Sequence, residues 1–309
     1  MPQSLGAMDM EELPQWKREL PPIPHKLFNE ALNLLAEFYK EHIRRDIDAR
    51  RLTPPDSWIM LRGFLVAAMQ TYASICILLE DKRPKPLMLQ AGILNRALFE
   101  ILASVVALTE DLVARTQVLA RESYKSHALR YARWAARFGS DPKWTEYLEV
   151  CRKGLAIIAK ELSLAPELEQ NPSAIQDEWP TPGVMVYGRP NRKIPPFVSG
   201  TRHAVLKELY EFHYPHQSAQ AHGRVASMAV AMLVDDPSQQ WNPGYGESDI
   251  VCTALLFMAC ILSEIESAGG YTHHAKLAEL WTYLRNAHDE PKELWHLRYE
   301  ELSHGVKGV

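Results

Sequence analysis

Apolar residues recur every three or four positions along most of the chain, which is the spacing of an amphipathic helix and not of a strand. The first stripe of this kind comprises Leu27, Ala31, Leu34, Leu35 and Phe38. Residues 24–309 are therefore expected to form one helical domain. Residues 1–23 are acidic, contain proline and lack an apolar core, so we expect a flexible tail there.

Proline, glycine and aspartate divide this pattern into separate helices, because these residues end a helix or cap its first turn. The pattern predicts helices over about residues 56–79, 87–108, 110–138, 201–214, 216–233, 247–268 and 272–288, with further helices starting at 142 and after 291. Pro215 is expected to interrupt the helix that begins near Thr201. The sequence thus predicts an all-α multi-helix bundle of about nine helices with almost no strand.

Residues 166–200 depart from the helical pattern. Seven of the 21 prolines fall in this segment, and helix propensity drops there. A short hairpin around residues 184–187 is compatible with the sequence. The segment is either a linker between two helical halves or an ordered loop over a site, and its aromatic residues favour the ordered loop.

Composition indicates a globular, intracellular protein. Apolar residues make up 47% of the chain and charged residues 23%, and the net charge is −4. This charge excludes a uniformly basic nucleic-acid binder but not a local basic patch. The four cysteines (Cys76, Cys151, Cys252 and Cys260) are scattered without a CxxC motif, which is typical of reduced thiols in the cytoplasm.

Two apolar stretches were considered as membrane spans. Residues 87–108 carry Arg96 and Glu100 near their middle, and residues 250–262 are shorter than the ~20 residues that a spanning helix needs. We therefore expect both stretches to be buried core helices and the protein to make no membrane contact.

Arg96 and Glu100 lie four residues apart in the apolar stretch, hence on one face of a helix. A single buried charge is costly, so the two side chains should pair with each other and with a third group. Removing either partner is then expected to cost about 3–5 kcal/mol. The pair is either a structural ion pair or part of a polar site at the bundle centre.

Ser218 and His222 form a second candidate, because they also lie four residues apart on the helix expected after Pro215. Histidine titrates near neutral pH, and a hydroxyl beside it can act as a partner or as a nucleophile. Ordinary packing and a functional polar site both remain open. The histidine spacing matches no zinc signature, so no metal and no cofactor is expected.

The Arg-x3-Glu helix, followed about 110 residues later by a Tyr…Ser-x3-His helix, resembles a widespread bacterial family of all-helical proteins known only as a domain of unknown function. The matching residues are Arg96, Glu100, Tyr210, Ser218 and His222, within residues 55–235. Such proteins are similar in architecture to HEPN domains, which often dimerise and several of which cleave RNA without a metal. The resemblance implies RNA as a partner and a homodimer.

Two other motifs give no support for a particular chemistry. The loose Arg-x4–6-His ribonuclease motif occurs twice, at Arg121…His127 and Arg298…His304, which is about what chance predicts. Two Glu-x2-His pairs, at Glu293 and Glu301, fall on one terminal segment, whereas a di-iron bundle needs them on two helices. Both motifs are therefore set aside.

A basic face is predicted between Arg115 and Arg137, because this stretch contains six Arg and Lys residues and one acidic residue. Arg130, Arg133 and Arg137 share one side of the helix, with Trp134 beside them. Arg189 and Arg192 add charge in the proline-rich segment. The face is either simply solvated or a contact for a phosphate backbone, by charge and aromatic stacking.

Two functional hypotheses follow from these patterns. The first is a HEPN-like protein that binds or cleaves RNA, in stress or phage defence. Its polar centre would comprise Arg96, Glu100, Ser218 and His222, with His222 as acid and base and Arg96 stabilising phosphate charge. The second is a non-catalytic binding or regulatory module whose polar cluster fixes helix register or holds a small ligand. Whether the protein is an enzyme is left open by the sequence.

Overall fold

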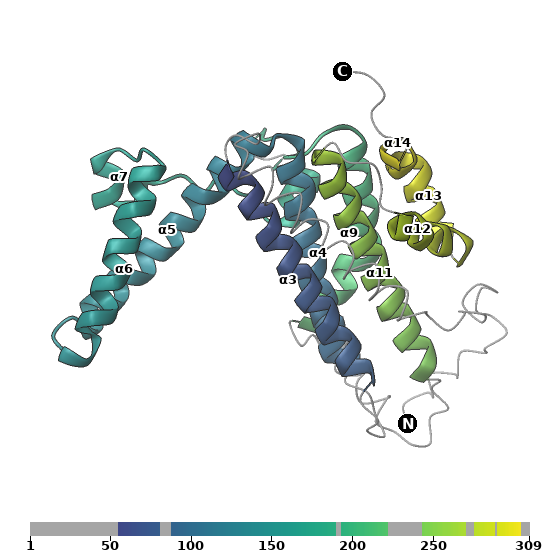
Figure 1. The fold of residues 1–309 in the computed structure, drawn as a ribbon, viewed down its shortest axis with the longest axis horizontal. Coiled ribbons are helices and arrows are strands. Elements are labelled where there is room, and N and C mark those ends of the chain that lie inside the picture. The colour runs from purple at the N-terminus through teal and green to yellow at the C-terminus, as the bar shows by residue number, and fades with distance from the viewer. Residues whose placement is uncertain are drawn as a thin grey trace, which may run out of the picture.

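The computed structural model describes residues 55–80, 88–189, 193–221, 243–269, 275–287 and 289–303. Helices make up most of these residues, which contain one isolated bridge between Arg189 and Ile194 and no strand. The predicted all-α bundle is therefore confirmed (Figure 1). The expected tail at 1–23 and the first apolar stripe lie outside the described residues, so the proposed domain limits stay a prediction.

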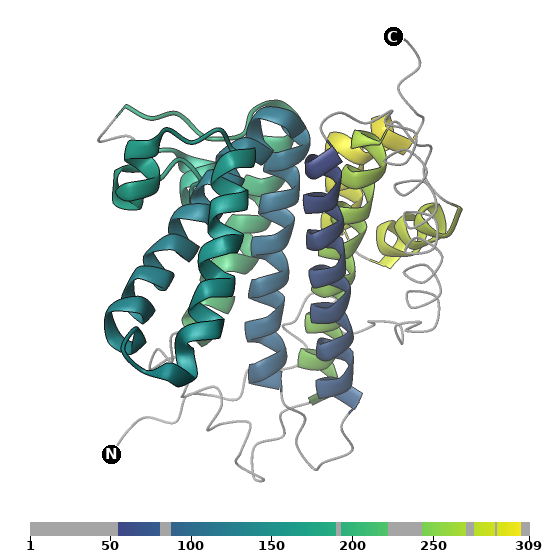
Figure 2. The ribbon, with the colours of Figure 1, turned by 60° about the vertical axis from the view of Figure 1, so that its left-hand side comes forward.

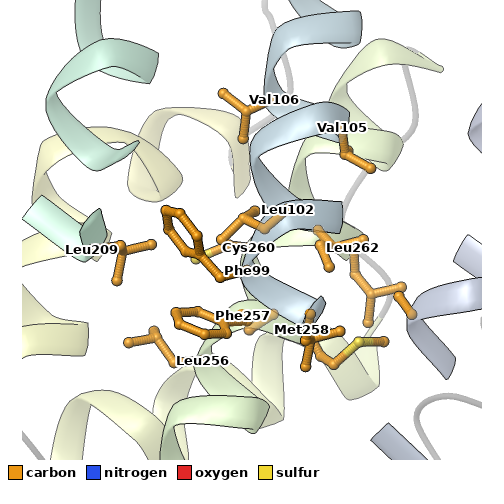
Figure 3. Packing of buried hydrophobic residues seen from close by; sticks show 14 of the residues in the cluster. Phe99, Leu102, Val105, Val106, Leu209, Leu256, Phe257, Met258, Cys260 and Leu262 are labelled. Atoms are coloured by element: carbon orange, nitrogen blue, oxygen red, sulfur yellow. The ribbon is translucent and has the colours of Figure 1, made fainter. Parts of the chain in front are cut away.

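Four long helices form the main bundle. They are α3 (Pro55–Glu80), α4 (Met88–Glu110), α9 (Gly200–Ala221) and α11 (Pro243–Ala268), and α4 contacts the other three. The nearly continuous apolar sequence of α4 fits this central place, because a helix covered on several sides has no polar face to keep. Phe99 and Leu102 of α4 pack on Phe257 of α11 within the core (Figure 3). Burying each such side chain contributes about 1.5–3 kcal/mol.

The C-terminal helices cover one side of this bundle. They are α12 (Ala275–Ala287), α13 (Asp289–Leu294), the π-helical turn η4 (Trp295–Tyr299) and α14 (Glu300–Ser303). Trp281 is fully buried and stacks on Tyr299 with ring centroids 4.8 Å apart. Its indole N–H donates to the Ser263 hydroxyl at 2.9 Å, so the ring is both packed and hydrogen-bonded.

A helical hairpin projects to one side of the bundle, and we call it the arm. It contains α5 (Leu112–Phe138) and α6 (Pro142–Glu161), followed by the short helices α7 (Pro166–Gln170) and η2 (Pro172–Ala174) (Figures 1 and 2). The carboxylates of Asp111 and Asp141 accept backbone N–H groups at the starts of α5 and α6. The arm has a small core of its own, formed by Tyr124, Ala128, Ala159, Leu164 and Ile175.

A cluster of polar contacts joins the arm to the bundle, and we call it the joint. The carboxylate of Glu110, the last residue of α4, accepts the backbone N–H of Ser199 at 3.0 Å and pairs with Arg115 of α5 at 3.4 Å. The Arg115 guanidinium also donates to the carbonyl of Phe197 at 2.7 Å and lies 3.6 Å from the centre of its ring. The joint therefore connects α4, α5 and the segment that leads into α9.

The described part of the proline-rich segment packs on the arm at η2 and on the bundle at α8 (Pro182–Tyr187). The hairpin expected at residues 184–187 is wrong, because α8 occupies that stretch and contacts α4 and α9. A bridge forms one step later, between Arg189 and Ile194. Gly188 makes this turn with a φ of +63°, a conformation that few other residues adopt.

One predicted helix break is also wrong. Pro215 lies inside α9, which continues without interruption from Gly200 to Ala221. The stacked rings of Tyr210 and Tyr214 hold the preceding turn against Phe99, and this packing offsets the hydrogen bond that proline removes. Residues 222–233, predicted to be helical, lie outside the described part of the chain.

Three described helices are long and apolar enough to cross a membrane: Met60–Leu79, Gln90–Glu110 and Ile250–Ala268. The expectation that residues 250–262 are too short to span a membrane is wrong, because the apolar helix continues through Glu264 and Glu266 to Ala268. The window in α11 is 83% buried within the bundle, whereas that in α3 is 33% buried. The absence of membrane contact stays a prediction.

Candidate functional site

Arg96 and Glu100 meet as predicted, and their third partner is Tyr214 of α9. The Arg96 Nε donates to the Glu100 Oε1 at 3.1 Å, and an Arg96 Nη lies 3.3 Å from the Tyr214 hydroxyl. The expected deep burial of this pair is wrong: the Arg96 side chain is 20% exposed and that of Glu100 is 44% exposed. The cluster lies at the rim of the α4–α9 contact, where solvent reaches it.

Aromatic rings extend from this cluster toward α8. Tyr210 and Tyr214 stack with centroids 4.7 Å apart, and the ring edge of Tyr187 meets Tyr210 at 5.5 Å. The Tyr187 hydroxyl donates to the Glu211 carboxylate at 2.8 Å, and burial with this bond raises the pKa of Tyr187 to about 12. Tyr210 thus lies beside the predicted pair. A Cβ at Gly183 would lie 2.9 Å from the Tyr210 hydroxyl, so a side chain there would require Tyr210 to shift.

The other half of the predicted site is not assembled by the described residues. Ser218 belongs to α9, one turn beyond Tyr214, and His222 lies just outside the described part of that helix. The joining of Arg96, Glu100, Ser218 and His222 into one centre therefore stays a prediction. Among the residues described, no group of three side chains could hold a metal ion.

A buried charge network that the sequence reasoning missed lies at the other end of α9. The Glu264 carboxylate of α11 is fully buried and accepts two bonds from the Arg298 guanidinium, one of them at 2.8 Å. Arg202 approaches the same carboxylate at 3.4 Å, and the Thr109 hydroxyl donates to it at 3.2 Å. Arg298 further donates to the Thr201 hydroxyl at 2.9 Å. The network joins α4, α9, α11 and η4.

The pKa values in this network indicate fixed charges in a dry environment. Burial by itself would lower the pKa of Arg298, but the bonds and charge of Glu264 outweigh it, and the pKa is raised. Burial raises the pKa of the neighbouring Cys260 thiol and of the Tyr299 hydroxyl, so both remain protonated. The network, which ties four helices together through Glu264 and Arg298, acts as a structural clamp.

The arm carries the predicted basic face. Arg130, Arg133 and Arg137 are exposed along α5. The Arg130 guanidinium lies 5.9 Å from the centre of the Trp134 ring, and that of Arg137 lies 5.2 Å from the Phe138 ring. These cations therefore lie beside aromatic rings at the outer end of the arm.

Aromatic rings from both helices gather at this outer end, which we call the arm tip. Phe138 and Trp144 stack nearly parallel, with centroids 4.3 Å apart and planes inclined by 8°. Tyr147 meets Trp144 at 5.8 Å and Trp134 at 5.6 Å. None of the four rings is fully buried, so the tip presents aromatic surface to solvent.

Of the two arginines predicted in the proline-rich segment, the structure describes Arg189. Arg189 is exposed, and its backbone pairs with Ile194 on the far side of the Gly188 turn. Arg192 lies outside the described residues. Of the predicted RNA-contacting residues, Arg130, Arg133, Arg137 and Arg189 are described and exposed, and their contact with RNA stays a prediction.

Comparisons with known proteins identify kinship but no activity. Residues 59–240 match the model of a family described as a family of unknown function (DUF5677). A search of the curated proteins and a search of the solved structures found no match. Function must therefore be argued from the geometry above.

Proposed function

Because the chain belongs to this family of unknown function, whose model matches more than half of its length, we propose a function from the geometry of the arm. The protein binds single-stranded RNA along α5 and across the arm tip. The supporting observation is the tip itself, where exposed arginines lie over partly exposed aromatic rings. Charge holds the phosphates in such sites, and the rings accept unstacked bases.

The charge of the arm differs from that of the whole chain. Residues 112–161 contain ten Arg and Lys against five Asp and Glu, although the chain as a whole has a net charge of −4. A polyanion would therefore be drawn to the arm and repelled by the remainder of the surface. This asymmetry gives the protein a defined place for a phosphate backbone.

The three arginines of the basic face are free to meet phosphates. No ion pair joins Arg130, Arg133 or Arg137 to any other described residue, whereas Arg152 on α6 is held by Glu149 at 2.7 Å. A solvated helix face usually has neighbouring acids that balance its charge. The unbalanced face favours a ligand that brings the negative charge.

The test is fluorescence polarisation of a labelled oligouridylate of about 20 nucleotides against the full-length protein. We expect binding whose logarithm falls with the logarithm of salt, and we expect Arg130→Glu/Arg133→Glu/Arg137→Glu to abolish it. The matched control, Arg62→Glu/Lys207→Glu/Lys292→Glu, makes the same charge change on the bundle and should retain binding. Salt-insensitive binding, or none at low salt, contradicts the proposal.

The contribution of stacking is tested separately by Trp144→Ala. A base stacked on an aromatic ring is worth about 1–3 kcal/mol, so the affinity should fall by about 5- to 150-fold while the salt slope stays unchanged. Circular dichroism checks that the arm remains helical. An unchanged affinity would limit the interaction to charge alone.

RNA cleavage is a second candidate function, favoured by the solvent-reachable position of Arg96, Glu100 and Tyr214. It requires Ser218 and His222 to complete the centre, with His222 as acid and base. We expect the protein to degrade labelled RNA in the presence of EDTA and His222→Gln to bind RNA without degrading it. Intact RNA after prolonged incubation would leave binding as the function.

A further inference from the structure

Helix α6 carries an apolar stripe beside the side that packs on α5, and Tyr147 at one end of the stripe also contacts Trp134 of α5. Leu148 and Ala159 are the buried residues of this helix. Tyr147, Val150, Ile157 and Ile158 keep between 38% and 63% of their surface exposed. Val150 follows Tyr147 by three residues, Ile157 follows Val150 by seven, and Ile158 comes next. The four side chains therefore lie along one helix face, with Gly154 at its centre.

We propose that α6 pairs with α6 of a second copy of this chain, in antiparallel orientation. In a heptad, Tyr147 and Gly154 take the a positions, and Val150 and Ile157 take the d positions, which is the seam of a two-stranded coiled coil. A side chain added at Gly154 would meet nothing within 4 Å. The centre of the seam is therefore open, and two backbones can approach closely there.

The charges beside the stripe specify the orientation. Glu146 and Lys160 lie on the same side of the seam, one near each end of α6. Antiparallel pairing brings Glu146 of each copy beside Lys160 of the other, and so forms two symmetric ion pairs. In a parallel pair these positions would face uncharged positions of the partner helix, and neither ion pair would form. Lys153, the other charge on this side of the seam, is paired with Glu149 of its own helix at 3.6 Å. Neither residue has an ion pair with another described residue, so both are available.

A second copy of the chain fits this face of α6 because the stripe of apolar residues is complementary to itself. A two-fold axis across the middle of α6 matches Tyr147 to Ile157 and Val150 to Gly154, which pairs a large side chain with an open position. The interface is small, so we expect a reversible dimer whose population depends on concentration. The basic face formed by Arg130, Arg133 and Arg137 belongs to α5 and is not part of the seam.

Sedimentation velocity of the full-length protein over a range of concentrations tests the pairing, with no RNA present. We expect a monomer–dimer equilibrium, and we expect Val150→Glu and Ile157→Glu each to weaken the dimer by at least about ten-fold, because each places a charge in the apolar seam. Ile77→Glu on α3, where the native side chain is 68% exposed, is the matched control and should leave the dimer unchanged. Circular dichroism confirms folding of each variant. A strictly monomeric protein, or a dimer indifferent to Ile157→Glu, overturns the proposal.

Charge exchange tests the orientation. Glu146→Lys and Lys160→Glu should each weaken the dimer by about ten-fold, since both symmetric pairs become repulsive. The double variant Glu146→Lys/Lys160→Glu restores the pairs and should restore the dimer. A double variant weaker than either single change would contradict antiparallel pairing. These results do not depend on RNA, so they fail or succeed independently of the proposed function.

Discussion

Glu264 shows what a buried charge requires at the scale of single residues. Its side chain is fully buried, and Arg298, Arg202 and Thr109 surround its carboxylate. Arg96 and Glu100 form the opposite case, because the pair lies at the rim and solvent screens it. Breaking an Arg–Glu pair therefore costs more free energy of unfolding at the buried Glu264 than at the half-exposed Glu100.

Arg298→Met should lower the free energy of unfolding by about 3–5 kcal/mol, because it leaves Glu264 buried without its main partner. Arg298→Met/Glu264→Leu should recover much of the loss, since no charge then stays buried. Arg96→Met is the matched control and should cost about 0.2–1 kcal/mol. Urea unfolding measures all three, and simply additive effects at Arg298 and Glu264 would show that the two do not interact.

Glu208 of α9 should make the free energy of unfolding depend on pH. Burial raises its pKa, and the charges of Glu290, Glu293 and Glu211 raise it further. Protonation therefore favours the folded state: the stabilisation is full below the unfolded pKa and is lost as pH rises through the folded pKa. Glu208→Gln should raise the melting temperature at pH 7 and have no effect near pH 4, as scanning calorimetry can show. Solvent screening keeps the gain below about 0.5 kcal/mol, and equal gains at both pH values would contradict this origin.

The Arg96–Glu100 pair could be predicted because four residues along a helix bring side chains together. The apolar sequence around Glu264 likewise indicates that a charge there needs a partner. The partner itself could not be found this way, since Arg298 lies 34 residues further along the chain, on another helix. Only the packing of η4 against α11 brings the two together.

At the scale of elements, the sequence predicts a helix end well where residues within the same turn cap the helix. Asp141 and Pro142 start α6, as predicted, because a side-chain cap and a fixed φ act within one turn. Pro215 was expected to break α9, and it does not, because packing of the neighbouring tyrosines on Phe99 decides the outcome. Such contacts come from distant parts of the sequence and leave no local trace.

Gly188→Ala should disrupt the turn between α8 and the Arg189–Ile194 bridge. The new Cβ would lie 2.3 Å from the Ile194 carbonyl oxygen, at a φ of +63° that alanine rarely adopts. We expect a cost of about 1–3 kcal/mol and faster amide exchange at Arg189 and Ile194. Gly63→Ala, in the middle of α3 with open space around it, should instead stabilise by up to about 1 kcal/mol. Unchanged exchange in the Gly188 variant would contradict the strain.

At the scale of the whole molecule, the described residues form two apolar cores of unequal size. The bundle core includes buried residues from α3, α4, α9, α11 and the C-terminal helices, whereas the arm core has five buried residues. The all-α class could be predicted from the helical spacing of apolar positions. The projection of α5 and α6 away from the bundle could not, because an amphipathic stripe does not show which neighbour covers it.

The arm should therefore open more easily than the bundle. Native-state hydrogen exchange is expected to release the amides of α5 and α6 at lower urea than those of α4 and α11, because fewer buried contacts hold them. Tyr124→Ala, which removes the largest side chain of the arm core, should lower protection in the arm and leave the bundle unchanged. A single common exchange transition would show that the two cores unfold as one.

The joint gives the arm a mechanical property. From the joint to the arm tip, α5 extends for 27 residues, or about 40 Å at 1.5 Å per residue. Polar contacts of Glu110 and Arg115 hold its inner end, and Leu112 and Leu119 pack there on the bundle core. A sideways force at the tip is therefore multiplied into a torque on these contacts, as with a long lever on a short hinge. The stiffness of these contacts thus sets how far the tip swings.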